Sequence, residues 1–276
     1  MFDGSNKNLN YKFWDDFLLP KYFRKREMKV FEVGAGGGRN MRYLFNRLGD
    51  KVRIYGSDIS KKAIDYANSL DIGEFYVSEA HKFPIQDKYD LIVIVDVLEH
   101  LQTLGDVKAT VNNAIEHLKP NGFLYLSIPT ELNKFCLTWV FSKLPYFRNL
   151  SRRFFGHTIQ FDKKMVKDLV NVEGLTTLEV FYSAHLLTQI QMAFFYYIPK
   201  ILLSIAGNDI LQDMRDSQDV LGQSLSPLSF LKRFVVSISR PLASAAYVES
   251  VLRRKSGLAA GNIHLLLRKN ETYGKA

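Results

Sequence analysis

The residues with the clearest chemistry are a glycine cluster and carboxylates that follow apolar runs. The segment Glu32-Val33-Gly34-Ala35-Gly36-Gly37-Gly38 ends the first run, and Asp58 ends a second run about 20 residues later. Glycine lets the backbone turn sharply and lets a ligand approach without meeting a Cβ. A helix that begins at Arg39 presents free N–H groups to polar atoms, and an acid after the second strand can accept from ribose hydroxyls. The spacing predicts a nucleotide-containing cofactor.

Two other interpretations of these residues stay open. Asp58 can instead cap the helix that starts after Ile59. The dinucleotide fingerprint G-x-G-x-x-G/A would use Gly34, Gly36 and position 39, but Arg39 is too large for the close helix-to-strand packing required there. An NAD(P)-dependent oxidoreductase is therefore the weaker alternative.

The composition describes a basic chain with one sizeable core. It has 276 residues, 47% hydrophobic content and a formal net charge of +9. This size supports one main domain plus an elaboration. The single cysteine, Cys136, cannot form an intrachain disulfide, and the first residues lack a signal-peptide pattern, so we expect a cytoplasmic location. The positive charge favours an anionic partner without choosing among nucleic acid, phospholipid and an acidic substrate.

Strand-like and helix-like segments must position these residues. Apolar runs occur at 29–33, 52–57, 74–77, 89–95 and 122–128. Their alternation with helical segments predicts a parallel sheet covered by helices. The continuous apolar runs at 89–95 and 123–128 predict central strands that are buried on both faces. Ser60 can cap one helix, and Lys119-Pro120-Asn121-Gly122 supplies a stop and a turn before the next strand.

Five motifs in order along the chain resemble those of one enzyme family. They are Glu32–Gly38, Asp58, Ser78-Glu79-Ala80-His81-Lys82-Phe83-Pro84-Ile85, Asp96-Val97-Leu98-Glu99-His100-Leu101 and Leu118-Lys119-Pro120-Asn121-Gly122. The order is similar to that of class I S-adenosylmethionine-dependent methyltransferases, in their small-molecule branch with a Val-Leu-Glu-His-Leu motif. The resemblance implies an α/β fold: a Rossmann-like three-layer sandwich with a seven-stranded, mostly parallel sheet whose last strand is antiparallel. Its sixth and last strands are expected at 177–182 and 263–268.

The resemblance also implies how the cofactor S-adenosyl-L-methionine is held. Glu32 would hold the methionine amino group, Asp58 the ribose hydroxyls, and Glu79 the adenine amino group, while Asp96 would meet the methionine moiety. Glu79 is also explained as an ordinary solvated loop acid. The full implied set is Glu32, Gly34, Ala35, Gly36, Asp58, Ile59, Glu79, Ala80, Asp96 and Val97.

Candidate catalytic residues follow from the reaction. Methyl transfer from a sulfonium is a direct displacement, so most of the acceleration comes from holding the acceptor in line with the methyl group. A general base helps only where the acceptor must first lose a proton. His157, His100 and Glu99 are the candidates for that role, and each also has a structural explanation in a helix start or a backbone contact. We expect no metal site, because the six histidines are scattered without paired ligand spacing.

The segments added to the core indicate the acceptor. About 80 residues separate the last two strands, too many for a bare loop, which implies a helical insertion. Runs at 192–203 and 230–236 mix cations, aromatics and aliphatics, as do helices that cap a greasy pocket, contact a second copy or lie on a membrane. The aromatic and basic segment 134–155 would form a pocket wall. The expected division is an N-terminal helical lid 1–28, the cofactor-binding core 29–184, the insertion 185–260, the final strand 261–270 and a tail 271–276.

The sequence therefore predicts a methyltransferase for a small-molecule, lipid-linked or glycan acceptor, acting at oxygen. A non-catalytic scaffold that uses the insertion for partner or membrane binding is the main alternative. Nucleic acid is not expected as a partner, because the basic residues are dispersed and form no continuous stripe. A homodimer through the insertion and peripheral contact with the inner face of the membrane are the remaining expectations.

Overall fold

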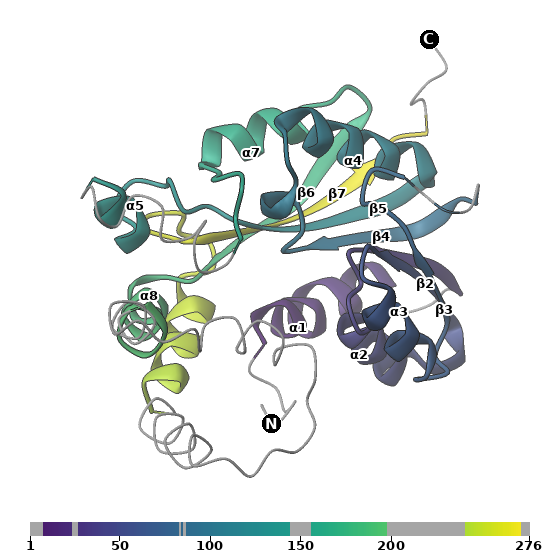
Figure 1. Cartoon of the computed structure of the whole chain (residues 1–276), viewed down its shortest axis with the longest axis horizontal. Helices are drawn as coiled ribbons and strands as arrows, with labels where there is room; N and C mark the ends of the chain where they lie inside the picture. Colours follow the sequence, from purple (N-terminus) through teal and green to yellow (C-terminus); the bar gives the residue numbers. More distant parts are fainter. Residues whose placement is uncertain are drawn as a thin grey trace.

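A seven-stranded sheet forms the centre of the computed structural model, which describes residues 8–23, 27–82, 84, 87–143, 156–197 and 241–271 (Figure 1). The strands are β1 Met28–Val33, β2 Val52–Asp58, β3 Glu74–Val77, β4 Tyr89–Val95, β5 Leu118–Pro129, β6 Leu175–Ser183 and β7 Asn262–Lys269. Their order is β3-β2-β1-β4-β5-β7-β6. Neighbours from β3 to β5 are parallel, whereas β7 is antiparallel to both β5 and β6. The predicted mostly parallel sheet with an antiparallel last strand is confirmed.

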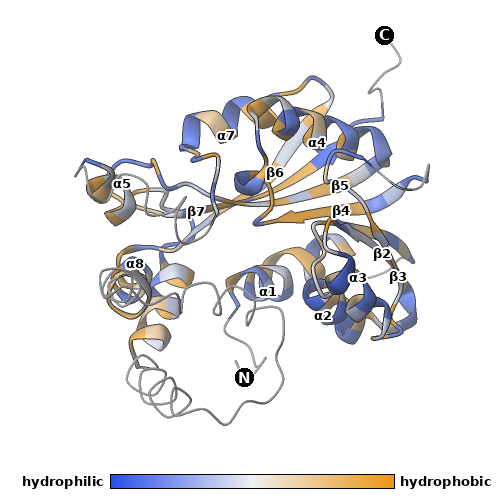
Figure 2. Cartoon of the chain, viewed as in Figure 1, coloured by the Kyte–Doolittle hydropathy of each residue, from blue (hydrophilic) through white to orange (hydrophobic). Residues whose placement is uncertain are grey.

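The central strands are buried on both faces because their side chains alternate between two cores. In β4, Val93 belongs to one hydrophobic cluster, while Ile92 and Ile94 belong to the other. All residues of β4 except the last are buried, which explains its unbroken apolar run. Figure 2 shows the same distribution, with apolar colouring on the central strands and hydrophilic colouring over much of α2 and α3.

Helices cover both faces of the sheet and complete the three layers. The longer ones are α2 Arg39–Leu48, α3 Lys61–Asn68, α4 Leu104–His117 and α7 Lys163–Val170. Figure 1 shows α4 and α7 on one side of the sheet and α1, α2 and α3 on the other. Ser60 caps α3 by accepting from the Ala63 N–H, as predicted. A capping box between Thr103 and Asp106 begins α4.

The fifth strand begins earlier than its apolar run. Residues 118–122, expected as a stop and turn, already belong to β5, because Leu118 pairs with Tyr89 before a register shift. Asn121 has φ +60, a left-handed conformation that asparagine tolerates. A turn motif and strand pairing therefore coexist in this segment.

The N-terminal segment packs on the sheet as part of the core. It consists of α1 Leu9–Phe13 and a π-helical continuation, Trp14–Phe23. Phe13 is fully buried and stacks on Phe181 at 4.9 Å between ring centroids. The Asn10 Oδ1 accepts from the Tyr125 hydroxyl at 2.7 Å. These contacts fix the segment against β5 and β6.

Three described stretches of the segment between β6 and β7 are helical. They are α8 Leu186–Met192, a π-helical turn Ala193–Tyr197 and residues 241–252. Glu249 joins the two ends by accepting from the Leu187 N–H at 2.8 Å. Residues 198–203, half of the run 192–203, and all of 230–236 lie outside the described residues. None of the described helices is long and apolar enough to cross a membrane.

Candidate active site

The glycine turn joins β1 to α2 and contains two glycines with different tasks. Both have positive φ, +70 at Gly34 and +51 at Gly36. A Cβ at Gly34 would overlap the Val97 side chain, so this position is required by packing. A Cβ at Gly36 would meet nothing within 4 Å. The space beside Gly36 is therefore where another molecule can approach the backbone.

Asp58 lies at the end of β2 and fastens the glycine turn. Its Oδ2 accepts from the Gly36 N–H at 2.9 Å, and its Oδ1 accepts from the Ser60 N–H at 2.9 Å. The N-cap of α3 is Ser60, so the alternative that Asp58 caps this helix is wrong; Asp58 instead holds the N–H of the capping residue. Each carboxylate oxygen has a second lone pair, so ribose hydroxyls can still donate to Asp58. The neighbouring Ile59 is 75% exposed, an apolar surface beside the same edge.

Glu32 is buried beneath the turn and carries a raised pKa. The residue is 1% exposed, and its Oε1 accepts from the Asn40 side chain at 2.7 Å. Its Oε2 has no hydrogen-bond partner among the described atoms. Burial raises the pKa of Glu32 to about 8. The Tyr11 hydroxyl donates to the Asn40 Oδ1 at 3.1 Å, so the N-terminal segment contacts this site through Asn40. Asn40 is not among the site residues predicted from the sequence.

Asp96 follows β4 and faces β5 and β7. Its backbone has φ +54, and its N–H donates to the Ser127 carbonyl at 3.1 Å. The Ser127 hydroxyl donates to the Asp96 Oδ1 at 3.3 Å, and the Asn262 amide donates to Ser127. Desolvation raises the pKa of Asp96, and the charges of His157 and Arg39 lower it less. Asp96 is thus within electrostatic reach of both the α2 start and the segment before α7.

The segment expected beside adenine has an exposed acid. Glu79 is paired with Lys82 at 3.0 Å and lies 3.3 Å from the His81 ring nitrogen. Ala80 is half-buried against the second core cluster. Phe83 and Ile85, which frame this motif, lie outside the described residues. The ion pairs of Glu79 are those of a solvated loop acid, and its role toward adenine stays a prediction.

The candidate catalytic residues come together from separate segments. Glu99 and His100 form a 3-10 turn after β4, and the Glu99 carbonyl accepts from the Ile159 N–H at 3.0 Å, which holds the segment of His157 nearby. One ligand atom from each of Glu99, His100 and His157 lies within 4.8 Å of the other two. The premise that the histidines are scattered fails for this pair, because His100 and His157 are 57 positions apart in the chain and still lie side by side.

Glu131 is a further member of this cluster that sequence reasoning missed. Its Oε1 lies 2.8 Å from the His157 Nδ1, and its side chain is 9% exposed. The sequence contains a pattern that could have indicated it: Thr130 and Glu131 are polar residues directly after the apolar fifth strand, where α/β sheets bind ligands. The rings of His100 and His157 meet edge to face at 5.0 Å. Residues 144–155 of the expected pocket wall lie outside the described residues.

Burial controls protonation in this cluster. It raises the pKa of Glu99 well above its usual range, and the nearby Asp96 carboxylate raises it further. Burial lowers the pKa of His100, and a positive charge on His157 would lower it too. The arrangement therefore favours a protonated Glu99 beside a neutral His100.

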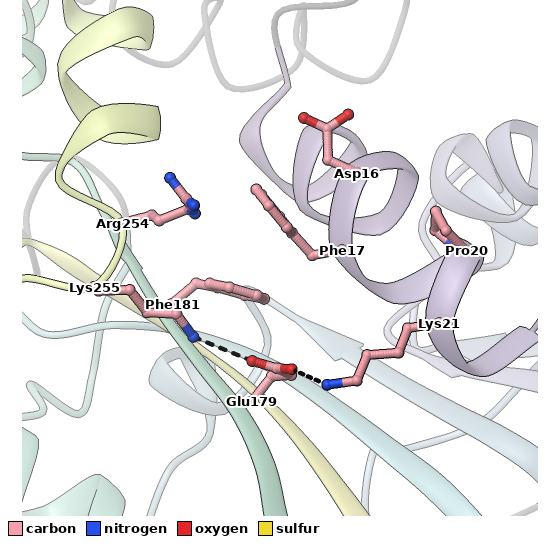
Figure 3. A pocket seen from close by; sticks show the side chains of 8 residues that line it. All are labelled: Asp16, Phe17, Pro20, Lys21, Glu179, Phe181, Arg254 and Lys255. Carbon is pink, nitrogen blue, oxygen red and sulfur yellow. Dashed lines mark hydrogen bonds and ion pairs between the residues drawn. The ribbon is translucent and has the colours of Figure 1, made fainter.

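A separate pocket lies away from these residues, between the N-terminal segment and β6 (Figure 3). It has a volume of about 390 Å³. The Glu179 carboxylate spans it with ion pairs to Lys21 at 2.9 Å and Lys255 at 3.1 Å, and the Arg254 guanidinium lies over the Phe17 ring. None of the predicted site residues lines this pocket.

The chain matches a family model and several known proteins over less than half of its length. Residues 31–124 match a family described as a methyltransferase domain. The chain is 32% identical over 136 residues to the hybrid PKS-NRPS synthetase poxE of Penicillium oxalicum, and 29% identical over 135 residues to the highly reducing polyketide synthase verA of Penicillium polonicum. These matches cover 44% and 45% of this chain but only 3% and 5% of those proteins.

Two solved structures share the fold along nearly the whole chain. A Galdieria sulphuraria protein, provisionally assigned as a sarcosine dimethylglycine methyltransferase, aligns with a TM-score of 0.57 at 16% identity and covers 95% of this chain and 85% of its own. The plantazolicin methyltransferase BpumL, in complex with a desmethyl analogue and SAH, aligns at 0.53 and 14% identity over 96% and 84%. The ordered motifs and the domain match agree that residues 31–124 form a methyltransferase domain, and the chain has the fold of class I S-adenosylmethionine-dependent methyltransferases.

Proposed function

We propose that this methyltransferase transfers the methyl group of S-adenosylmethionine to a hydroxyl oxygen of a small-molecule, lipid-linked or glycan acceptor. The observation that carries the oxygen assignment is the His157–Glu131 pair at 2.8 Å. It lies in the cluster that follows β4 and β5, and Asp96 links that cluster electrostatically to the start of α2.

The donor would bind along the ends of β1, β2 and β4. The open space beside Gly36 would admit the cofactor, Asp58 would accept from its ribose, and the exposed Ile59 would cover an apolar ring face. The buried Glu32 would meet the methionine amino group through Asn40 or a water. A cationic amino group close to Glu32 would favour the ionised carboxylate.

The acceptor would lose its proton to His157. With its Nδ1–H donating to Glu131, the imidazole would take the proton at Nε2, and the carboxylate would stabilise the resulting cation. An amine acceptor that arrives neutral needs no such base. The pair therefore favours a hydroxyl, whose proton must leave before or during attack on the methyl carbon.

Exposed apolar side chains support an acceptor with an apolar part, or contact with a membrane surface. They lie at the described ends of the insertion and beside it: Phe135, Leu186, Phe194, Val248 and Leu252. Together with the net charge of +9, this surface suits a lipid-linked substrate held at an anionic bilayer. Flotation of the intact protein with anionic vesicles and with neutral vesicles tests that part, which is wrong if neither recovers protein in the lipid fraction.

Methyl transfer to defined acceptors tests the proposed reaction. The full chain is incubated with radiolabelled S-adenosylmethionine and matched hydroxyl and amine acceptors, including polyprenyl-linked sugars and free glycans. Label in hydroxyl products that resist mild base indicates an ether and agrees with the proposal. Label confined to amines contradicts the oxygen assignment, and binding of S-adenosylmethionine with no transfer to any acceptor favours the scaffold alternative.

A further inference from the structure

We propose that Glu99, His100 and His157 bind one divalent transition-metal ion, with Zn²⁺ the best match to the donor set. One ligand atom of each residue lies within 4.8 Å of the other two. Two imidazoles and one carboxylate are a three-ligand set typical of zinc sites that keep a further position open. The inference concerns ion binding and does not depend on the acceptor proposed above.

Both imidazoles are oriented in the way that metal-binding histidines usually are. The His157 Nδ1 faces the Glu131 carboxylate at 2.8 Å, and the His100 Nδ1 faces the Gly156 carbonyl at 3.3 Å. An acceptor at Nδ1 fixes that nitrogen as the donor, so coordination by either ring would use Nε2. Glu131 would then be a positioning residue that holds the His157 ring rather than a ligand.

Glu99 supplies a second, independent observation for this site. The residue is 1% exposed, and its Oε2 has no hydrogen-bond partner among the described atoms. A buried carboxyl oxygen without a partner is costly unless a proton or a cation satisfies it. The Nε2 of the His100 ring lies 3.9 Å from the Glu99 Oε1, beyond hydrogen-bonding distance. A metal ion between the two side chains would bind both the Glu99 carboxylate and the His100 Nε2.

The spacing requires a small closure of the cluster. Ligands about 2.1 Å from a tetrahedral ion lie about 3.4 Å apart, so separations of up to 4.8 Å must shorten by up to about 1.4 Å. His100 can provide it, because its side chain is 45% exposed and belongs to a short turn rather than to a strand. Glu99 and His157 are held more firmly by burial and by Glu131.

Ion binding would also change the role of His157. As a ligand it would not accept a proton at Nε2, and an acceptor hydroxyl at the open position would instead be made more acidic by the metal. Metal-free and metal-loaded protein should therefore differ in the pH dependence of methyl transfer.

Cobalt absorption tests the site on the intact, untagged protein after treatment with a chelator. Co²⁺ is titrated while its visible d–d bands are followed, and Zn²⁺ is then added. We expect one equivalent of Co²⁺ to give intense bands that Zn²⁺ abolishes. Glu99→Gln, His100→Ala and His157→Gln should lose the bands, Glu131→Gln should weaken affinity about 10- to 100-fold, and His81→Ala, which changes a histidine outside the cluster, should behave as wild type.

Three controls keep the outcome decisive. Far-UV circular dichroism identifies variants that fail to fold, and the half-exposed His100 offers a ligand whose removal leaves the buried residues in place. S-adenosylhomocysteine binding is measured on the same preparations, so a failed metal site is distinguished from a failed cofactor site. Absence of the cobalt bands in the wild type, or bands that survive His100→Ala and His157→Gln, would overturn the proposal.

Discussion

The two halves of the candidate site are built in different ways. The donor side, proposed to bind S-adenosylmethionine, is held by backbone groups: the Gly36 and Ser60 N–H groups donate to the Asp58 carboxylate. The glycine turn and Asp58 both lie within the unit from β1 to β2. On the acceptor side, side chains from three separate segments meet, and Glu99 keeps an oxygen without a partner.

This difference makes the donor side the fixed half of the site and the acceptor side the adjustable half. The backbone N–H groups that hold Asp58 do not titrate, and the group with a raised pKa on this side is the buried Glu32. On the acceptor side, burial shifts the pKa values of Glu99 and His100, so this side can change with pH, acceptor or metal. Variants should therefore affect binding of the donor and transfer to the acceptor separately.

The largest expected effect is on transfer. His157→Gln should lower kcat by about 10²- to 10⁴-fold, because the acceptor proton loses its base, while affinity for S-adenosylhomocysteine stays unchanged. Single-turnover transfer and calorimetry measure the two quantities on the same protein. Equal losses in both would show that the two halves are not separable.

Gly34→Ala should lower both the stability of the protein and its affinity for the cofactor, because Gly34 belongs to the fixed half of the site. The new Cβ must enter left-handed backbone at φ +70 and overlap Val97, which should cost about 2–4 kcal/mol of stability together with loss of cofactor affinity. Urea unfolding reports the first quantity. The double variant with Val97→Ala should recover part of the loss, and no recovery would mean that the backbone conformation alone sets the cost.

Asp58→Asn should weaken cofactor binding by about 1.5–3 kcal/mol, because a charged acceptor for two hydroxyls is removed. Calorimetric titration with S-adenosylhomocysteine measures the change. Asp65→Asn, which alters an exposed ion pair with Lys61 on α3, is the matched control and should have the affinity of the wild type. An unchanged affinity in Asp58→Asn would remove this carboxylate from the site.

The smallest effect concerns Glu32 and pH. Its folded pKa of about 8 is above its unfolded value, so the protonated acid favours the folded state below the unfolded pKa, and this stability is lost as pH rises through about 8. Relative to Glu32→Gln, the cofactor-free wild type should lose about 1 kcal/mol between pH 6.5 and 7.5. Parallel denaturation curves for the two proteins at each pH measure it, and a constant difference would place the pKa outside this window.

The same contrast explains what the sequence could reveal. Strand burial follows from local apolar runs, as in β4, and the glycine turn with Asp58 lies within one β-α-β unit, so local patterns predicted both. Glu131 and Asn40 were missed because their partners are fixed by tertiary packing. The Glu99, His100 and His157 cluster was missed as a unit because spacing along a chain does not report which loops fold to the same edge.

Calorimetric titration of the wild type with S-adenosylmethionine, S-adenosylhomocysteine and NADH tests the central claim most directly. We expect both sulfur ligands to bind with one-to-one stoichiometry at micromolar concentration, and NADH to give no heat beyond dilution. Binding of NADH alone, or of none of the three, would contradict the assignment of the glycine turn and Asp58 to a methyl donor.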